Sequence, residues 1–362
     1  MTSFAIALVA LLAPVQDATK DTIDVVFCID CSGSMGPVIE TAKKKVWAVV
    51  NEIAKDRPKA ALRIGLIGYG NADAEYRFFN LTDDLDQVYQ DLMKFKDEGW
   101  GDEWVGLVIH KARTEMKWTR GKNVLRILFV VGNETARQGP EQFDYAKTAP
   151  EAIKSEIVVN AIYCGDYDLA SATPTWKEMA KLADGSYQEI AAQGGSVSIA
   201  TPFDKDLAEL SAKLNGTYVA YGRRAKEGEE KQKDQDDNAQ AKEPAAAADR
   251  ALAKSSEQYN NAYWDLVDAS RDEKFDLKKL RDEELSEEMK KMSVEERKAF
   301  IETKAKERAE LQVKIRELSE KRDAYTKEEM AKQGLSADKA LDEAVKKMVR
   351  EQAAKKGEAF GK

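Results

Sequence analysis

The sequence predicts a doubly wound, mostly parallel open α/β sheet, followed by a charged, all-helical C-terminal region. Strand-like runs alternate with helical patterns up to about residue 222, as expected of parallel strands joined by covering helices. Beyond that point the chain is rich in Lys, Glu, Ala, Asp and Arg, a composition that favours helices or disorder. We therefore predict a signal peptide over 1–18, an α/β domain over 22–222, a charged linker over 223–251 and a helical region over 252–362.

The strands of the first domain are predicted from their apolar runs. Residues 24–30, DVVFCID, are almost continuously apolar, which is typical of a strand buried on both faces. Residues 62–70, 123–134 and 155–166 repeat this pattern, whereas residues 75–82 alternate between polar and apolar side chains. The intervening segments have helical spacing, the first of them after Pro37, which suits a first helical turn. The predicted helices cover residues 38–54, 82–95, 105–116 and 175–187, with a last one that begins at residue 206.

The second half reads as helices around one apolar cluster. Residues 223–251 lack large apolar side chains and are expected to be mobile or loosely helical. The aromatic and aliphatic residues between Tyr259 and Val267 must be buried on some surface. Helical patterns follow over 276–325 and 335–357. Trp264 either packs on the helices at 276–325 or docks on the first domain, and we expect the first arrangement, an autonomous helical unit. A partner-binding or oligomerising arm is the alternative function of this region.

The first residues and the overall charge bear on location and partners. Phe4–Ala13 is an apolar run too short to span a bilayer, and it fits the core of an export signal. Such a signal predicts a periplasmic or extracellular protein, and the alternative is a buried terminal strand or helix in a cytoplasmic one. The formal net charge of −8 argues against a nucleic-acid partner.

The first strand ends in the motif Asp30-x-Ser32-x-Ser34. Binding sites in such sheets lie at the carboxyl ends of the strands. One carboxylate and two hydroxyls form an oxygen-only ligand set, which suits Mg²⁺ or Mn²⁺, with Ca²⁺ as a further candidate. Zinc fits poorly because His110 is the single histidine of the chain. The alternative interpretation is that these side chains only cap the following helix.

The wider pattern resembles the von Willebrand factor A domain family with its metal-ion-dependent adhesion site. The resemblance covers roughly residues 22–222 and rests on the stretches DCSGSM, GWGDEW, RILFVVGNE and LADGSYQEI. It implies that Asp30, Ser32 and Ser34 bind a divalent cation, and that a carboxylate from a protein partner completes the coordination. The two-part arrangement also resembles bacterial exported proteins that carry such a domain and a helical C-terminal extension.

Two positions depart from the family pattern. Where the family commonly has Gly-Gly-Thr, this chain has Gly99-Trp100-Gly101-Asp102-Glu103, and Asp102 is assigned to the Thr position. Where the family commonly has Thr-Asp-Gly, this chain has Gly132-Asn133-Glu134, and Asn133 is assigned to the Asp position. The predicted metal ligands are therefore Asp30, Ser32, Ser34, Asp102 and Asn133. A site kept only for structure is the alternative.

Three classes of function remain from the sequence. The first is a metal-dependent protein-binding module outside the cytoplasm, for adhesion or scaffolding. The second is a cytoplasmic adaptor that partners an ATPase or chelatase. The third is a hydrolase with a metal-activated water, for which Glu103 or Glu134 would be the base. We expect the first, without enzymatic activity, because the chain has neither a phosphate-binding Gly-Lys-Ser/Thr loop nor a Gly-x-Ser-x-Gly motif.

Two further features stay open at the level of sequence. Trp100 and Trp104 flank Asp102 and would form either an exposed aromatic rim or core beneath the loop. Cys31 and Cys164 both follow strands, so a disulfide between them is conceivable in an exported protein if their Cα atoms come within about 7 Å.

Overall fold

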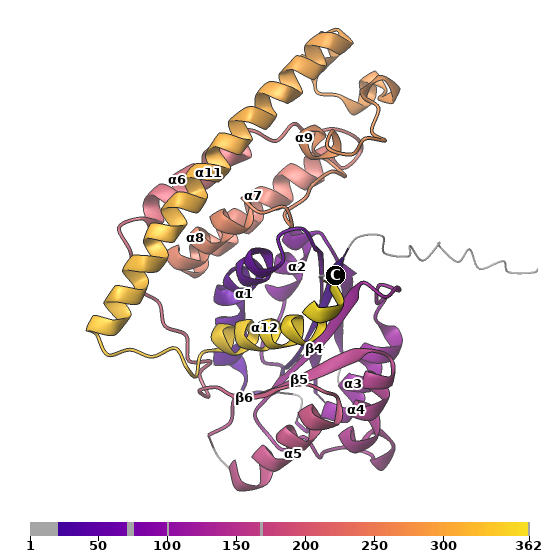
Figure 1. Cartoon of the computed structure of the whole chain (residues 1–362), viewed down its shortest axis with the longest axis vertical. Helices are drawn as coiled ribbons and strands as arrows, with labels where there is room; N and C mark the ends of the chain where they lie inside the picture. The colour runs from indigo at the N-terminus through magenta and orange to yellow at the C-terminus, as the bar shows by residue number, and fades with distance from the viewer. Residues whose placement is uncertain (1–20, 71–75, 100, 167–168, 361–362) are drawn as a thin grey trace, which may run out of the picture.

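The computed structural model describes residues 21–70, 76–99, 101–166 and 169–360 of the 362-residue chain (Figure 1). Within these residues the centre is a six-stranded sheet in the order β3-β2-β1-β4-β5-β6. Neighbouring strands are parallel except β2 and β3, which are antiparallel. The strands are β1 (Thr22–Asp30), β2 (Ala61–Tyr69), β3 (Arg77–Thr82), β4 (Val124–Gly132), β5 (Ile157–Tyr163) and β6 (Tyr187–Glu189). The predicted open, mostly parallel sheet is confirmed.

Helices cover both faces of this sheet (Figure 1). One face carries α1 (Gly36–Asp56), α2 (Leu85–Leu92) and α12 (Leu341–Phe360), and the other carries α3 (Val105–Glu115), α4 (Tyr145–Lys154) and α5 (Leu169–Leu182). Strands covered on both sides must be apolar on both sides. Accordingly, all nine residues of β4 are buried.

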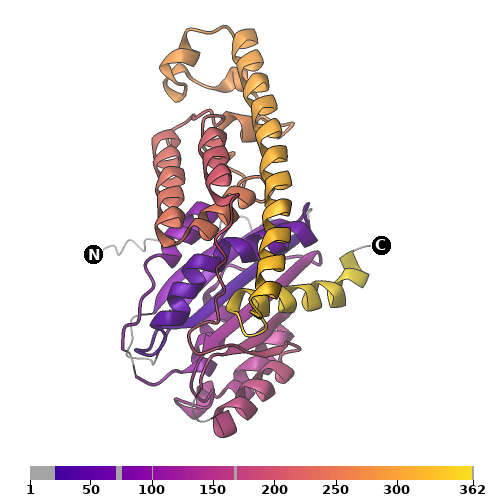
Figure 2. The ribbon, with the colours of Figure 1, turned by 90° about the vertical axis from the view of Figure 1, so that its left-hand side faces the viewer.

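A large helical region lies between β6 and α12 in the chain. Its main helices are α6 (Asp204–Asn215), α7 (Ala225–Lys242), α8 (Pro244–Ala253) and the long α11 (Val294–Lys332), with short helices α9 (Leu266–Ala269) and α10 (Glu287–Lys290). Figure 2 shows α11 running alongside this group and past it at the far end from the sheet. The two ends of the region meet, because Ala191 N donates to Lys339 O at 3.0 Å and Leu341 N donates to Gly194 O at 3.0 Å.

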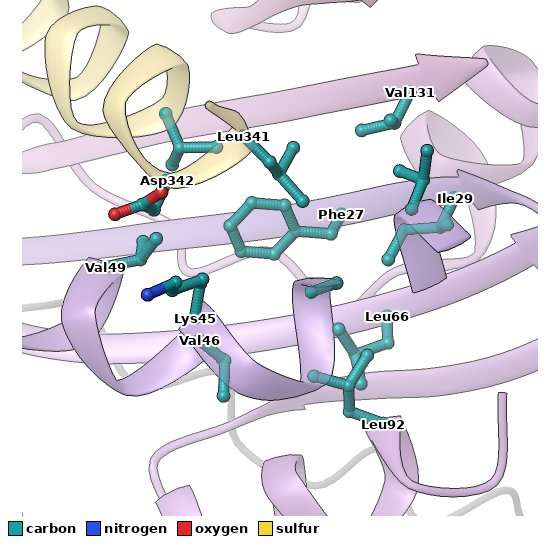
Figure 3. Close-up of a pocket in the computed structure, with 13 residues that line it drawn as sticks. Phe27, Ile29, Lys45, Val46, Val49, Leu66, Leu92, Val131, Leu341 and Asp342 are labelled. Atoms are coloured by element: carbon teal, nitrogen blue, oxygen red, sulfur yellow. The ribbon is translucent and has the colours of Figure 1, made fainter. Parts of the chain in front are cut away.

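The last helix of the chain, α12, completes the cover of the sheet. Its buried side chains, which include Val345 and Met348, belong to the same core as those of β1 and α1. A small apolar cavity of about 40 Å³ remains between the three elements. Figure 3 shows Phe27 of β1 in this cavity, with Leu341 of α12 on one side and Val46 of α1 on the other.

Composition left residues 223–251 either mobile or loosely helical, and the structure shows them helical and packed. They form α7 and most of α8. Both helices pack on α1, α7 packs also on α2, and α8 packs also on α6. Lys231 is buried and donates to Asp84 Oδ2 at 3.0 Å. Residues 245–248, four alanines, are also buried. Composition alone does not show this, because a charged side chain can be buried once a partner such as Asp84 pairs with it, and small alanines pack closely between helices.

The helical region is not the autonomous unit that we expected. Tyr259 donates to Asp86 Oδ2 at 2.6 Å, so the apolar cluster docks on α2 of the first domain. Trp264 is buried at 1% exposure and stacks on Tyr218, with ring centroids 5.4 Å apart. Because Tyr218 lies within residues 22–222, this packing agrees with the alternative, in which Trp264 docks on the first domain.

The division of the chain at residues 222 and 252 stays a prediction. Packing crosses these boundaries in both directions, since α6 contacts α8 and α11 while α12 contacts α1. The charged stretch, the helices after it and the α/β domain therefore share their buried surfaces.

The predicted signal peptide, residues 1–18, lies outside the described residues. Among the helices of the described part, none combines the length and apolar character needed to span a bilayer.

Candidate functional site

The candidate site lies where β1 and β4 end side by side at the centre of the sheet. Asp30 is the last residue of β1, and Asn133 directly follows β4. Chain connections leave the sheet in opposite directions from its central strands, which opens a crevice at this edge. The loop from Cys31 to Met35 then leads straight into α1, so Ser32 and Ser34 lie on the rim of the same edge.

Asp30 is fully buried and organises the loop that follows it. Its Oδ1 accepts a hydrogen bond from Ser32 N at 2.7 Å, and its Oδ2 accepts one from Ser32 Oγ at 3.2 Å. Burial raises the pKa of Asp30 above its usual range, and the nearby carboxylate of Glu134 raises it further. A nearby positive charge would stabilise the ionised form of this buried carboxylate.

Asn133 supplies a buried oxygen with no partner. Its Nδ2 donates to Ser34 Oγ at 2.7 Å, which orients the amide. The side chain is only 5% exposed, and among the described residues its Oδ1 accepts no hydrogen bond. Buried polar atoms without partners are rare and call for an explanation such as an ion or a water molecule. This oxygen therefore fits a cation site beside Asp30.

Asp102, which we assigned to the site, differs in burial from its neighbour in the loop before α3. Its side chain is exposed, and none of the described residues forms a hydrogen bond or ion pair with it. The next residue, Glu103, is only 3% exposed, and the Ser32 hydroxyl is among the groups that act on the pKa of its carboxyl. Gly99 and Gly101 both have positive φ, at 65° and 76°, which sets the course of this loop. The backbone of the loop thus turns Glu103 inward and Asp102 outward.

Gln138 holds Glu103 in place. Glu103 N donates to Gln138 Oε1 at 3.0 Å, while Gln138 Nε2 donates to Glu103 Oε2 at 3.2 Å and to Glu134 Oε2 at 2.7 Å. Burial raises the pKa of Glu103, and the charges of Asp30 and Glu134 raise it further. Sequence reasoning considered Glu103 and Glu134 only as bases and missed Gln138. The one signal in the sequence was that Glu103 and Glu134 directly follow Asp102 and Asn133. That signal does not show which residue of each pair faces the site.

The donor set of the site fits a hard divalent cation. It consists of the Asp30 and Glu103 carboxylates, the Ser32 and Ser34 hydroxyls and the Asn133 amide oxygen, all of them oxygen donors. No group of three His, Cys, Asp or Glu side chains in the described parts of the chain could hold a metal. A cation here would therefore depend on the hydroxyl and amide oxygens as well as on the carboxylates.

The cysteines near the site do not form the disulfide that the sequence left open. Cys28, Cys31 and Cys164 are all buried free thiols. Cys31 Sγ donates to Ile29 O at 3.5 Å, whereas Cys164 Sγ lies 3.6 Å from Met35 Sδ and 3.2 Å from Gly132 O. The two thiols thus serve as small packed side chains beneath the loop.

The sequence left open whether Trp100 and Trp104 form an exposed aromatic rim, and Trp100 lies outside the described residues. Trp104 is half-buried, its ring packs directly on Gly139, and its Nε1 is buried. The Trp104 side chain therefore packs beneath the loop and does not form an exposed aromatic rim.

Comparisons with known proteins bear on this fold and site. The family model of the von Willebrand factor type A domain matches residues 25–135, from β1 to just past β4. No curated protein matches the chain. Similar solved structures include BatB from Bacteroides thetaiotaomicron, at 17% identity, a TM-score of 0.37, and coverage of 47% of this chain and 90% of that one.

Two other solved structures are similar to this chain. The VWA domain of SpRpn10 is 16% identical, with a TM-score of 0.37 and coverage of 47% of this chain and 89% of that one. Proximal thread matrix protein 1 from the mussel byssus, with a zinc-occupied MIDAS motif, is 14% identical, with a TM-score of 0.38 and coverage of 48% and 42%. Over residues 25–135, which build β1 to β4 and end just after Asn133, the chain is therefore similar to von Willebrand factor type A domains.

Proposed function

We propose that this protein is a non-enzymatic, metal-dependent protein-binding module that acts outside the cytoplasm. Von Willebrand factor type A domains are in general protein-interaction modules. The observation that carries the proposal is the unpartnered, buried Oδ1 of Asn133, which lies at the same edge of the sheet as the buried carboxylate of Asp30. Protein binding at this edge then depends on the cation.

Asp30, Ser32, Ser34, Glu103 and Asn133 would hold the cation. When bound, Mg²⁺ or Mn²⁺ would supply a positive charge at the rim of the sheet, where Ser34 is exposed. The buried carboxylates of Asp30 and Glu103 repel each other in the metal-free protein, and the cation would relieve that repulsion. Zinc is disfavoured because the donors are oxygen atoms.

Calorimetry with Mg²⁺ and Mn²⁺ tests the metal site. Asp30→Ala is expected to abolish divalent binding, and Glu103→Ala to weaken it. Asp102→Ala is the matched control, because Asp102 carries the same charge next to Glu103 but is exposed. Circular dichroism in chelator checks that each variant folds. Unchanged binding by Asp30→Ala, or an equal loss in Asp102→Ala, would rule out this ligand set.

Partner capture from the cell envelope tests the binding role. The wild-type protein is expected to retain a partner with Mg²⁺ and to release it in chelator, whereas Asp30→Ala retains none. Cell fractionation tests the location, which rests on the apolar run Phe4–Ala13. A cytosolic protein that co-purifies with an ATPase would favour the adaptor function instead.

The chemistry of the partner group depends on the charge that the site already carries. The family resemblance implies a carboxylate from the partner. The family pattern has an Asp where this chain has Asn133, so a carboxylate at Glu103 would keep the number of acidic ligands unchanged.

A further inference from the structure

We propose that the polar cleft between α1, α8 and α11 binds a linear alkyl diamine or polyamine, a small organic cation with N–H donors at both ends. α8 contacts both other helices, so the cleft lies where the helical region meets the first domain (Figure 1). The residues that line it are different from the proposed metal ligands. The inference therefore goes beyond the proposed function and needs neither its metal ion nor its protein partner.

The shape of the cleft comes from helix faces that lie opposite one another. Its volume is about 600 Å³, which is within the usual size of a small-molecule site. α1 lines it from Ala48 to Lys55 and α11 from Arg316 to Asp323, and both sets include positions i, i+3, i+4 and i+7 of one helix face. Seven residues of helix rise by about 10 Å, so the cleft suits a linear ligand.

Gln258 contributes an acceptor oxygen to the lining of this cleft. The side chain is 7% exposed, and its Nε2 donates to the backbone oxygens of Arg57, Pro58 and Ala60 at 3.0, 3.0 and 3.3 Å. The amide cannot be reversed, because its oxygen would then face three carbonyl oxygens. Oε1 is therefore the atom left for a ligand, and it accepts no hydrogen bond from any described residue.

Two more side chains of the lining lack a partner. Asn51 Nδ2 donates to Asp249 O at 2.8 Å, which leaves its buried Oδ1 as a free acceptor among the described residues. Ser319 is 5% exposed, and in the described part of the chain its Oγ forms no hydrogen bond. Buried polar atoms without partners are rare, so three of them around one cleft indicate a ligand that donates hydrogen bonds.

The lining also carries an excess of negative charge. Five carboxylates and three basic side chains belong to it. Two of the carboxylates accept hydrogen bonds from Arg322 and Arg350, which lie outside the lining. Two of the basic side chains are likewise engaged by other groups, which leaves Lys55. The exposed carboxylates that form no ion pair with any described residue belong to Glu257, Glu320 and Asp323. An organic cation would balance this excess.

An alkyl diamine matches both features of the lining. An ammonium group carries three N–H donors and no acceptor, so it can bind amide oxygens and carboxylates alike. The methylene groups between two such ends would lie against the apolar part of the lining, which includes Ala48, Pro58 and Leu252. A carboxylate or phosphate ligand would instead meet amide oxygens that only accept and carboxylates that repel it. The cleft therefore favours an amine cation over an anion.

Calorimetry of the full chain in chelator tests this with three probes on the same five-carbon chain: diaminopentane, pentanediol and glutarate. We expect the cationic probe to bind and the neutral and anionic ones not to. Ser319→Ala removes an unpartnered hydroxyl, so it should fold normally and weaken diaminopentane binding by about tenfold. Glu320→Gln should weaken it by about two- to fivefold. Glu310→Gln is the matched control, because Glu310 is exposed on the same helix but does not line the cleft.

Several results would overturn the proposal. The first is that diaminopentane does not bind the wild type, and the second is that pentanediol or glutarate binds as tightly. Unchanged affinity in both cleft variants would place the ligand elsewhere. An equal loss in Glu310→Gln would show only a general attraction to an acidic protein. Because the titration is done in chelator, its failure leaves the metal-dependent function to be decided by the Mg²⁺ and Mn²⁺ titrations.

A measurement on the wild type alone locates the ligand. Methyl-labelled alanine and leucine resonances are followed by NMR as diaminopentane is added in chelator. The methyl signals of Ala48 in α1 and Leu252 in α8 should shift, because both side chains line the cleft, whereas that of the exposed Leu169 in α5 should not. Shifts that spare both Ala48 and Leu252 would overturn the proposal.

Discussion

Arg250 joins the helical region to the first domain, and its removal should destabilise the whole protein. This residue of α8 is 1% exposed. Its Nη1 donates to Asp86 Oδ1 at 2.7 Å, its Nη2 donates to Gln232 O at 2.9 Å, and its guanidinium lies 4.8 Å from the centre of the Trp47 ring. Asp86 is itself buried in the first turn of α2. The pair thus connects two parts of the chain that are 164 residues apart.

The size of the effect follows from burial. Arg250→Met fills similar space but leaves Asp86 with the Tyr259 hydroxyl as its remaining partner. Breaking a buried ion pair on one side costs about 3–5 kcal/mol, because an uncompensated charge stays in the interior. We therefore expect Arg250→Met to lower the free energy of unfolding by about 3–5 kcal/mol. Adding Asp86→Asn removes the uncompensated charge and should restore part of this loss.

Urea unfolding followed by circular dichroism measures this loss. With a slope of about 3 kcal/mol per molar, the midpoint should fall by roughly 1–1.7 M. Arg281→Met is the matched control, because the Arg281 side chain is 54% exposed and its ion pairs with Glu283 and Glu284 lie at the surface. Exposed ion pairs contribute little to stability. A loss in Arg250→Met no larger than in this control would show that the helical region docks without the buried pair.

Three further predictions concern the packing and the site. In chelator, the melting temperature should fall as the pH rises from about 4 through the raised pKa values of Asp30 and Glu103. The reason is that the folded, metal-free protein binds more protons in this pH range than the unfolded chain does. Asp30→Asn should flatten this fall, and a profile that this variant leaves unchanged would contradict the assignment. Gly228→Ala should destabilise the protein, although alanine is the better helix former by about 1 kcal/mol, because a Cβ on α7 would collide with the Trp264 ring; thermal melting decides the sign. Met348→Ala should lower the free energy of unfolding by about 2–5 kcal/mol, because Met348 of α12 is 1% exposed and packs in the core between α12 and the sheet. Chemical unfolding measures this loss, and alanine at the exposed neighbour Lys347 should change the free energy of unfolding very little.

Local patterns in the sequence were sufficient for β1 to β5 and for half of the site, whereas the short strand β6 begins at a residue that we placed in a helix. The apolar runs that became β1 and β4 are long and continuous, so their ends, and with them Asp30 and Asn133, could be placed from the sequence. Ser32 and Ser34 follow Asp30 within one short loop and had to lie nearby. Because the carboxyl ends of parallel strands share one edge of the sheet, the strand pattern is enough to bring these residues together.

Tertiary structure alone decided which acidic residue faces the site. Asp102 and Glu103 are adjacent and chemically alike, and no periodic pattern distinguishes them in a glycine-rich loop. The positive φ angles of Gly99 and Gly101 and the two hydrogen bonds with Gln138 turn Glu103 inward. Gln138 lies 35 residues further along the chain, so its contact leaves no trace in the local sequence.

The same reason explains the helical region. Composition described residues 223–251 correctly as charged, but not where those charges go. Lys231 pairs with Asp84 across 147 residues, and Arg250 pairs with Asp86 across 164. α12 likewise covers a sheet whose first strand lies some three hundred residues earlier in the chain. Periodicity and composition report only on neighbours along the chain, whereas the burial of a charge depends on the partner that folding places beside it.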